Sequence, residues 1–392
     1  MSKMTEQTTL AMYSGKKSNK LIPIHSEKRL SLSQMIKKTE ERPWKTGEFA
    51  MQNWGNWLHH MSAYVGKLKP GMAHWLIRVS TIPGDTVLDP FSGIGTVPLE
   101  ADLMGRKGIG IDLNPYAAAI SRAKFDRKSL DHRISYLENL KLDTKSIKTK
   151  EISPFIKQYF HEKTLKEIFA LKQILIDEKQ DFLLGCLIGI LHGHRPGHLS
   201  ATTSLVIPFV PKTKAEYREV IPRMIEKTKR MYRDEVPLKT KTKIYEKDSR
   251  NKVLKNDTVD AVVSSPPYYN TLNYVTDNRL RIAFLGYDED GRSDLDDKLI
   301  QHRADYLEDM RKVGKRLKDC IKPDGHCIFV LGDMHSGKKT INTAQDIGEV
   351  YKELGFKVHE NIVEDKMPDN KSHPSSSKRR KNDRILFMIN KK

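Results

Sequence analysis

Short apolar runs and amphipathic stretches alternate in two separate parts of this chain. In the first part, residues 86–89 and 108–112 have the apolar character of buried strands, and residues 97–104 and 114–123 have the spacing of short helices. Gly105 stands where the first of these helices should end, as glycine commonly does. This order predicts a βαβ unit with parallel strands.

The same pattern resumes in the second half of the chain. A buried strand is expected at 259–264 and another at 326–331, with helices at 304–320 and 342–354. A last strand pair is expected at 357–363 and 385–389, joined by a connector rich in Ser, Pro and Lys. The two parts together predict one α/β sheet.

The remaining segments lack this alternation. Residues 127–243 carry helical stretches at 157–172, 181–192 and 214–233, the last with a kink possible at Pro222. Residues 1–45 are polar and rich in Lys and Ser, which predicts a mobile basic arm with a short helix near 30–36. The domain prediction is an arm at 1–45, a first catalytic part at 46–126, an inserted region at 127–243 and a second catalytic part at 244–392.

Composition points to a polyanionic partner. The net charge is +19 and the isoelectric point is near 9.5, so nucleic acid is the first candidate and an anionic membrane surface the second. No apolar run approaches the roughly 18 residues of a membrane span, and no secretory leader is visible. Cys186, Cys320 and Cys327 have no close pairing and indicate reduced thiols, which predicts a cytoplasmic protein.

The run from Asp89 to Thr96, Asp-Pro-Phe-Ser-Gly-Ile-Gly-Thr, follows the first predicted strand. Its glycines let the backbone approach a ligand, and Thr96 is a plausible N-cap of the next helix. A phosphate-binding loop would need Gly-Lys-Ser or Gly-Lys-Thr here, and Pro98 replaces the third glycine of a dinucleotide motif. Asp112, at the end of the next strand, could accept both hydroxyls of a ribose, or it could simply cap the following helix.

A second motif, Ser265-Pro266-Pro267-Tyr268, follows the strand at 259–264. The prolines fix the backbone and carry no N–H, so they leave carbonyl acceptors exposed. Serine adds a hydroxyl and tyrosine a flat ring. This set suits a planar group with an exocyclic amine, such as a nucleobase, although an ordinary strand-to-loop turn would have the same composition.

These two motifs, together with Gly110-Ile111-Asp112, resemble those of the DNA amino-methyltransferases. The resemblance covers roughly residues 60–125 and 245–392, and the Ser-Pro-Pro-Tyr form is most similar to the cytosine-N4 branch. It implies a Rossmann-like methyltransferase fold, with a mostly parallel seven-stranded sheet and a C-terminal antiparallel hairpin strand. It also implies that residues 127–243 form a largely helical target-recognition region, although that assignment rests on position alone.

The resemblance implies S-adenosylmethionine as the cofactor. Asp112 is then assigned to the ribose and Asp248 to the adenine, and residues 64–76 correspond to the motif beside the methionine group. The predicted cofactor-binding residues are Asp89, Phe91, Ser92, Gly93, Gly95, Thr96, Asp112, Leu113 and Asp248. The predicted catalytic residues are Ser265, Pro266, Pro267 and Tyr268.

The implied reaction is direct methyl transfer to an exocyclic amine of a base rotated out of duplex DNA. Carbonyl and hydroxyl oxygens of the lip would accept the N–H bonds of the amine, and Tyr268 would stack on the base. Methylation of a ring carbon needs a cysteine nucleophile, typically after a proline, and none of the three cysteines follows a proline. Ring-carbon methylation is therefore disfavoured, and the resemblance of the Ser-Pro-Pro-Tyr form to the cytosine-N4 branch implies N4 of cytosine as the target.

Residues expected to contact double-stranded DNA lie in the loops and the connector, and they are Tyr269, Asn270, Arg195, His198, Arg279, Lys378, Arg379 and Arg380. The basic stretch 214–233 is a further candidate for contact with phosphates. His192, His194 and His198 suggest zinc, but no cysteine or carboxylate lies nearby, so no metal is predicted.

The expected setting is a prokaryotic restriction–modification system, with an endonuclease that acts on the same site without stable binding. Three alternatives remain open. The cofactor motif precedes the Ser-Pro-Pro-Tyr motif, an order also found in adenine-N6 enzymes. Related tRNA enzymes that methylate a guanine amine share similar motifs. A chain without activity could serve as a DNA-binding subunit.

Overall fold

The computed structural model describes residues 29–51, 54–193, 197–201, 211, 213–234, 241–267, 273–300, 304–336, 339–359, 362–366 and 382–392. The strands of the main sheet are β1 Thr86–Asp89, β2 Lys107–Asp112, β3 Lys243–Glu246, β4 Val259–Ser264, β5 Ile321–Gly332, β8 Phe356–Val358, β9 Val363–Lys366 and β10 Asn382–Asn390. A small hairpin is formed by β6 Met334–Ser336 and β7 Lys339–Ile341.

The helices of the sheet layers are α2 Leu32–Glu40, α3 Pro70–Ser80, α4 Thr96–Leu103, α5 Pro115–Ala123, α13 Tyr306–Cys320 and α14 Thr343–Glu353. The helices of the second region are α6 Leu130–Asn139, α7 Pro154–Lys157, α8 Glu162–Asp177, α9 Asp181–Ile190, α10 Val220–Met231, α11 Arg279–Phe284 and α12 Glu289–Lys298. Short 3-10 turns are η1 Pro43–Lys45, η2 Gly47–Ala50, η3 Trp57–His60, η4 Thr149–Glu151 and η5 Thr276–Asn278.

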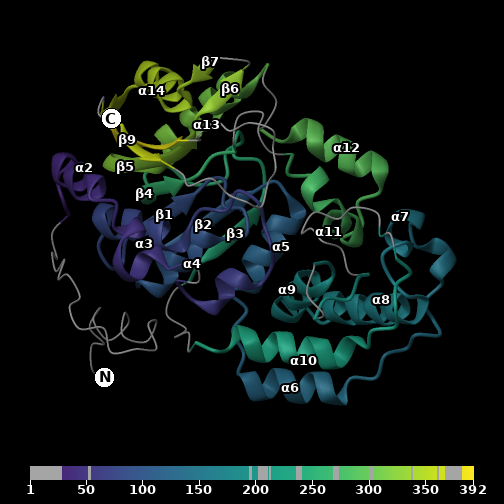
Figure 1. Ribbon diagram of the computed structural model, residues 1–392. Helices are drawn as coiled ribbons and strands as arrows, with labels where there is room; N and C mark the ends of the chain where they lie inside the picture. Colours follow the sequence, from purple (N-terminus) through teal and green to yellow (C-terminus); the bar gives the residue numbers. More distant parts are fainter. Residues whose placement is uncertain are drawn as a thin grey trace.

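The sheet confirms the predicted α/β class. Its strand order is β3-β2-β1-β4-β5-β10-β8 (Figure 1). The strands β3, β2, β1, β4 and β5 are parallel, and β10 runs antiparallel between β5 and β8. The sheet has eight strands rather than seven because the strand expected at 357–363 is divided. Its pieces, β8 and β9, pair with successive parts of the same edge of β10.

Side chains alternate between the two faces of the sheet, as the period of a strand requires. Val87, Val263 and Ile328 pack on one face with α3 and α4, while Leu88, Val262 and Phe329 pack on the other with α13 and α14. In Figure 1 these helix pairs lie on opposite sides of the central strands. Because both faces are covered, the central parallel strands β1 and β4 are almost entirely buried, whereas β3 at the edge of the sheet is partly exposed.

The expectation of a mobile arm is wrong for residues 29–45. Ser31 caps α2 through a capping box, and Met35, Ile36 and Trp44 are buried against α3. Arg29 also forms ion pairs with Asp85 at 2.7 Å and with Asp260 at 2.9 Å. The short helix predicted at 30–36 is therefore part of the folded domain, and residues 1–28 lie outside the described part of the chain.

The helical region is docked onto the sheet domain through an unusually close contact. A Cβ on Gly189 of α9 would lie 2.0 Å from the carbonyl oxygen of Met61, and one on Gly185 would lie 2.4 Å from Cβ of Ala123 in α5. Only glycine permits such a backbone approach. The core formed there also includes Leu280 and Phe284 of α11, so α11 packs with the inserted helices although it follows β4 in the chain.

Several predicted boundaries shift by a few residues. Helix α10 begins at Val220, which leaves Pro222 within the first turn rather than at a kink inside the helix. Gly95, and not Thr96, is the N-cap of α4, and Thr96 is its first residue. The strand expected at 326–331 begins earlier, at Ile321, and β5 contains an irregularity where its pairing with β4 jumps from Ile321 to His326.

Candidate functional site

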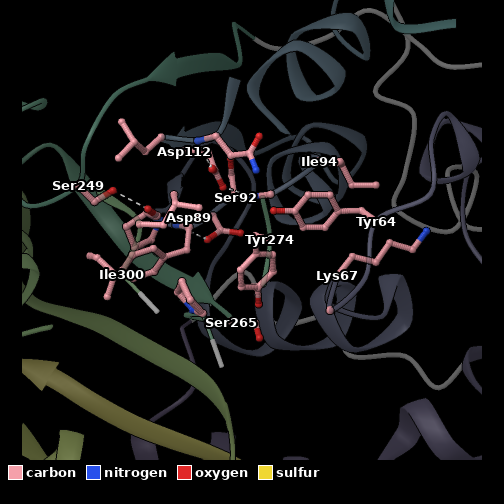
Figure 2. Close-up of a pocket in the computed structure, with 18 of the residues that line it drawn as sticks. Tyr64, Lys67, Asp89, Ser92, Ile94, Asp112, Ser249, Ser265, Tyr274 and Ile300 are labelled. Carbon is pink, nitrogen blue, oxygen red and sulfur yellow. Dashed lines mark hydrogen bonds between the residues drawn. The ribbon is translucent and has the colours of Figure 1, made fainter. Parts of the chain in front are cut away.

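A cavity opens at the carboxyl ends of β1, β2 and β4 (Figure 2). Ligands of open α/β sheets bind at this edge. Of the predicted cofactor and lip residues, those lining the cavity are Asp89, Phe91, Ser92, Gly93, Thr96, Asp112, Leu113, Asp248, Ser265 and Pro267. Gly95 and Pro266 do not line it.

Asp89 lies in the middle of this cavity wall, at the end of β1. Its Oδ1 accepts a 2.6 Å hydrogen bond from the Ser264 hydroxyl at the end of β4, and a 3.1 Å bond from the Phe91 amide. Burial raises the pKa of Asp89 to about 7, against the lowering effect of both hydrogen bonds. Asp89 is therefore a buried acid that joins two parallel strands.

Asp112 fixes the glycine loop from the end of β2. Its Oδ2 accepts from the Gly93 amide at 2.7 Å, and its Oδ1 accepts from the Asn114 amide at 2.8 Å. Burial raises the pKa of Asp112 to about 6. The helix that follows is capped by Asn114, whose side chain accepts from Tyr116, so Asp112 is not the N-cap. Each carboxylate oxygen retains acceptor capacity for a ligand hydroxyl.

Gly95 shapes the site without lining it. Its φ is +77°, a conformation that residues with a side chain rarely adopt, and a Cβ there would lie 2.2 Å from the Ser121 hydroxyl oxygen of α5. The glycine therefore lets the start of α4 approach α5. Gly93, with φ of +50°, faces the ring of Tyr64 across the cavity.

Asp248 is engaged in an ion pair. Both its oxygens accept from Arg250, with the shortest contact at 2.7 Å, and Arg250 also reaches Asp309 on α13 at 2.7 Å. Arg250 donates a further bond to the carbonyl oxygen of Lys298, a residue of the cavity wall. The carboxylate predicted to contact adenine is thus held in place by a guanidinium.

The lip after β4 is described as far as Pro267. Ser265 and Pro267 are half-buried at the cavity, while Pro266 is buried behind them. The Pro267 carbonyl oxygen accepts a 3.0 Å hydrogen bond from the Tyr306 hydroxyl of α13. Tyr268, the predicted stacking residue, lies outside the described residues.

Aromatic rings form the opposite side wall. Tyr64 stacks on Tyr274 with ring centroids 5.9 Å apart, and it lies near Tyr116 on its other side. The 3-10 turn η3, which precedes Tyr64, is held by Glu100 of α4. The Glu100 carboxylate contacts His59 of η3 at 2.6 Å and His74 of α3 at 2.9 Å. Although burial opposes it, these bonds lower the pKa of Glu100 to about 2. The wall is therefore anchored to α4 by a buried charge.

Of the predicted DNA contacts, His198 and Arg279 lie in the described part of the chain, and neither lines the cavity. His198 is half-buried and its carbonyl accepts from Arg218, and half-buried Arg279 interacts with Tyr159. The others lie outside the described residues: Tyr269, Asn270, Arg195, Lys378, Arg379 and Arg380. His192 bonds to Ser200, and within the described residues no group of His, Cys, Asp or Glu could hold a metal ion.

Cys186, Cys320 and Cys327 are buried, and none lines the cavity. Burial raises the pKa of the Cys186 thiol to about 11 and that of Cys320 to about 12, and it holds Cys327 well above its usual value. A thiolate nucleophile is strongly disfavoured at each position.

Part of the cavity wall was not predicted. Lys298, the last residue of the highly polar helix α12, lines it together with the next two residues, Leu299 and Ile300. No sequence motif marks these three positions. Ser249 was singled out only as a neighbour of Asp248, yet its hydroxyl donates a 2.5 Å bond to the Pro90 carbonyl. Asn114 and Pro90 stand inside or beside the predicted motifs, which is the signal that could have identified them.

None of the helices in the described part of the chain is both long and apolar enough to cross a membrane.

Comparison with known proteins agrees with this geometry. A family model described as DNA methylase matches residues 3–123. The chain is 27% identical over 279 residues to the type II methyltransferase M.BsoBI of Geobacillus stearothermophilus, covering 60% of this chain and 53% of that protein. It is 32% identical over 96 residues to M.MjaII of Methanocaldococcus jannaschii, covering 24% of this chain and 17% of that protein.

A shorter match links residues of this chain to a tRNA (guanine(10)-N2)-dimethyltransferase of Methanothermobacter thermautotrophicus, at 38% identity over 52 residues, 13% of this chain and 16% of that protein. Among solved structures, TrmN from Thermus thermophilus aligns with a TM-score of 0.32 and 10% identity, covering 85% of this chain and 52% of that one. A likeness at that level adds nothing to the sheet order seen here.

The chain spans about half the length of M.BsoBI and less of the other two relatives. The family model covers the glycine loop and Asp112, which are the parts that shape the cavity. The chain is therefore similar to DNA methylases in the part that carries the glycine loop and Asp112, and this similarity supports S-adenosylmethionine as the cofactor.

Proposed function

We propose that this chain is a DNA methyltransferase of a restriction–modification system that methylates the exocyclic N4 amine of cytosine in duplex DNA. The observation that carries the proposal is that one and the same cavity is lined by two buried acids at strand ends, Asp89 and Asp112, and by residues of the Ser265–Pro267 lip. The type II methyltransferase relatives support the same general activity. A cognate endonuclease would act on the same DNA site without stable binding to this chain.

The residues present fit S-adenosylmethionine. Asp112 offers carboxylate oxygens for ribose hydroxyls, and Asp248, which also lines the cavity, offers a carboxylate as an acceptor for an adenine amine. Phe91, Leu113 and Ile300 supply apolar wall for a purine ring. When bound, the cofactor supplies a methyl group on a positively charged sulfur, and buried carboxylates favour a cation.

The lip is proposed to act on the amine. An exocyclic amine is conjugated with its ring, so it is a poor nucleophile until its lone pair is localised. The hydroxyl and carbonyl oxygens of Ser265 can accept its N–H bonds and favour a pyramidal nitrogen. Alignment with the methyl group can contribute on the order of 7–11 kcal/mol, and the methylated nitrogen is acidic enough to release its proton afterwards.

Adenine N6 is the nearest alternative target, because its amine needs the same acceptors and the cofactor motif precedes the lip in this chain. The match to a tRNA guanine-N2 enzyme favours a second candidate, methylation of a guanine amine in RNA. Rotation of the target base out of the duplex belongs to the DNA proposal, and stacking of that base on Tyr268 would offset part of its cost by roughly 1–3 kcal/mol.

The test is incubation of the protein with labelled S-adenosylmethionine and either duplex DNA or tRNA, followed by digestion to nucleosides and mass spectrometry. N4-methylcytosine supports the proposal, while N6-methyladenine or N2-methylguanine assigns the alternatives. Ser265→Ala should lose methyl transfer and retain cofactor binding. If the protein binds DNA but yields no methylated nucleoside, it is a DNA-binding subunit and the proposal is rejected.

A further inference from the structure

The Ser265–Pro267 lip has an unusual requirement for support. Pro266 and Pro267 carry no N–H, so the backbone of these two residues cannot be held by hydrogen bonds that it donates. These two residues are held through their carbonyl oxygens and their packing. Any group that fixes the Pro267 carbonyl therefore has a large influence on where the lip lies.

Tyr306 provides such a group. It is the first residue of α13, its side chain is 1% exposed, and its hydroxyl donates a 3.0 Å hydrogen bond to the Pro267 carbonyl. Its ring packs in the same core cluster as Val262 of β4 and Ile300 of the cavity wall. The hydroxyl thus extends from a packed helix to the backbone of the lip.

The same turn of α13 also holds a second part of the cavity wall, formed by Asp248 and Lys298. Asp309, one turn after Tyr306, accepts from Arg250 at 2.7 Å. Arg250 in turn binds Asp248 at 2.7 Å and the Lys298 carbonyl at 2.6 Å, and both residues line the cavity. The start of α13 therefore contacts both the lip and this second part of the wall, which sets the distance between them.

We propose that Tyr306 is a positioning residue for methyl transfer: its hydroxyl holds the Pro267 carbonyl so that the oxygens of Ser265 face the target amine. Tyr306 does not line the cavity and is not a catalytic residue. This role rests on the proposed function, because the lip must act on an amine for its position to affect turnover. Misplacement of reacting groups by about 1 Å can lower a rate about 100-fold.

The chain offers a matched control in Tyr351 of α14. It is 0% exposed and packs in the same core cluster as Tyr306, on the rings of Phe329 and Phe356. Within the described structure its hydroxyl has no hydrogen-bond partner. Tyr351→Phe therefore removes a buried hydroxyl from the same core without touching the lip.

The experiment compares Tyr306→Phe, Tyr351→Phe and wild type in two measurements. Amide hydrogen exchange of the peptide spanning residues 260–275 should become faster in Tyr306→Phe alone. Methyl-transfer kinetics should show kcat lowered on the order of 10- to 100-fold in Tyr306→Phe, with the Kd for S-adenosylmethionine unchanged and Tyr351→Phe equal to wild type.

Equal exchange of the lip peptide in both variants overturns the proposal. If wild type transfers no methyl group to DNA or RNA, the proposed function fails, while the exchange measurement still decides whether Tyr306 holds the lip. The two failures are therefore distinguishable.

Discussion

Ser264 donates a 2.6 Å hydrogen bond to the buried carboxylate of Asp89, from a position 175 residues further along the chain. The bond links the ends of β4 and β1, the two strands that carry the lip and the glycine loop. Burial raises the pKa of Asp89, and this hydrogen bond opposes part of that rise. The glycine-loop motif, which begins at Asp89, and the strand end that precedes the lip are therefore in direct contact.

Ser264→Ala should lower the free energy of unfolding by about 1–3 kcal/mol, because it leaves a buried carboxylate with one partner fewer. It should also raise the pKa of Asp89, which is measurable by NMR titration. Ser249→Ala is the control: it removes a bond to the neutral Pro90 carbonyl at the same end of the sheet and should leave that pKa unchanged. Identical titrations of the two variants would contradict the prediction.

Asp112→Ala should weaken binding of S-adenosylmethionine by about 10- to 100-fold, because hydrogen bonds to charged groups contribute about 1.5–3 kcal/mol. Isothermal titration calorimetry measures the effect directly. Glu246→Gln is the matched control, since Glu246 ends the neighbouring strand and pairs with Arg122 outside the cavity. Unchanged affinity in Asp112→Ala would remove this residue from the ribose role.

Cofactor affinity should increase between pH 5 and pH 8. Burial raises the pKa of Asp112 to about 6 and that of Asp89 to about 7, so both ionise in this window and become better acceptors for hydroxyls and a better partner for a sulfonium. Calorimetry across the window checks this, and Asp89→Asn should flatten the response. A pH-independent affinity would exclude both acids from the effect.

The stability of the ligand-free protein should also depend on pH through Asp89 and Asp112. Stability should fall as pH rises, whereas cofactor affinity should increase. A buried acid with a raised pKa binds its proton more tightly in the folded state, so its contribution to stability falls as pH rises from about 4 to about 7. Urea unfolding of wild type and Asp89→Asn at several pH values isolates that contribution as the difference between them.

Gly189→Ala should destabilise the protein by about 1–3 kcal/mol, because the new Cβ would lie 2.0 Å from the Met61 carbonyl oxygen and would push α9 off the sheet domain. Gly197→Ala, where no atom lies within 4 Å of the added Cβ, serves as the control. Urea midpoints compare them, and equal midpoints would show that the close approach of α9 is not required.

DNA affinity should fall steeply with salt, as expected for a protein of net charge +19 that neutralises phosphates. A log–log plot of the binding constant against salt gives the slope. Lys229→Gln on α10 should reduce that slope by about one, whereas Lys148→Gln, an exposed lysine of a similar surface pair, should not change it. A flat salt response would contradict the role given to the basic surface.

The sequence predicted those parts of the site whose signal is local. Asp89, Gly93 and Asp112 stand in short motifs at strand ends, where a few residue types in a fixed order determine the turn, and all three reach the cavity. The strands are buried on both faces, so their apolar runs were clear. The lip at Ser265 followed from the same kind of signal.

The parts that were missed depend on contacts between distant segments. Ile300 reaches the cavity because it packs in the same core as Tyr306 of α13 and Val262 of β4, which no local pattern encodes. Residues 29–45 looked like a solvated tail because their few apolar side chains are spread among lysines, yet Met35 and Trp44 are buried. Thr96 was taken as the N-cap because its residue type is favoured there, but the close approach to Ser121 requires Gly95 at that position.

The link between Ser264 and Asp89 also bears on how the protein is made. Cavity residues come from the segment near Tyr64, from the ends of β1 and β2, and from Ser265 and Ile300. A ribosome that has released only the first part of the chain has therefore produced the glycine loop but not a complete pocket. A methyl donor would have little to bind until Ser265 and Ile300 have also been synthesised, which makes ligand capture a reporter of a completed pocket on the ribosome.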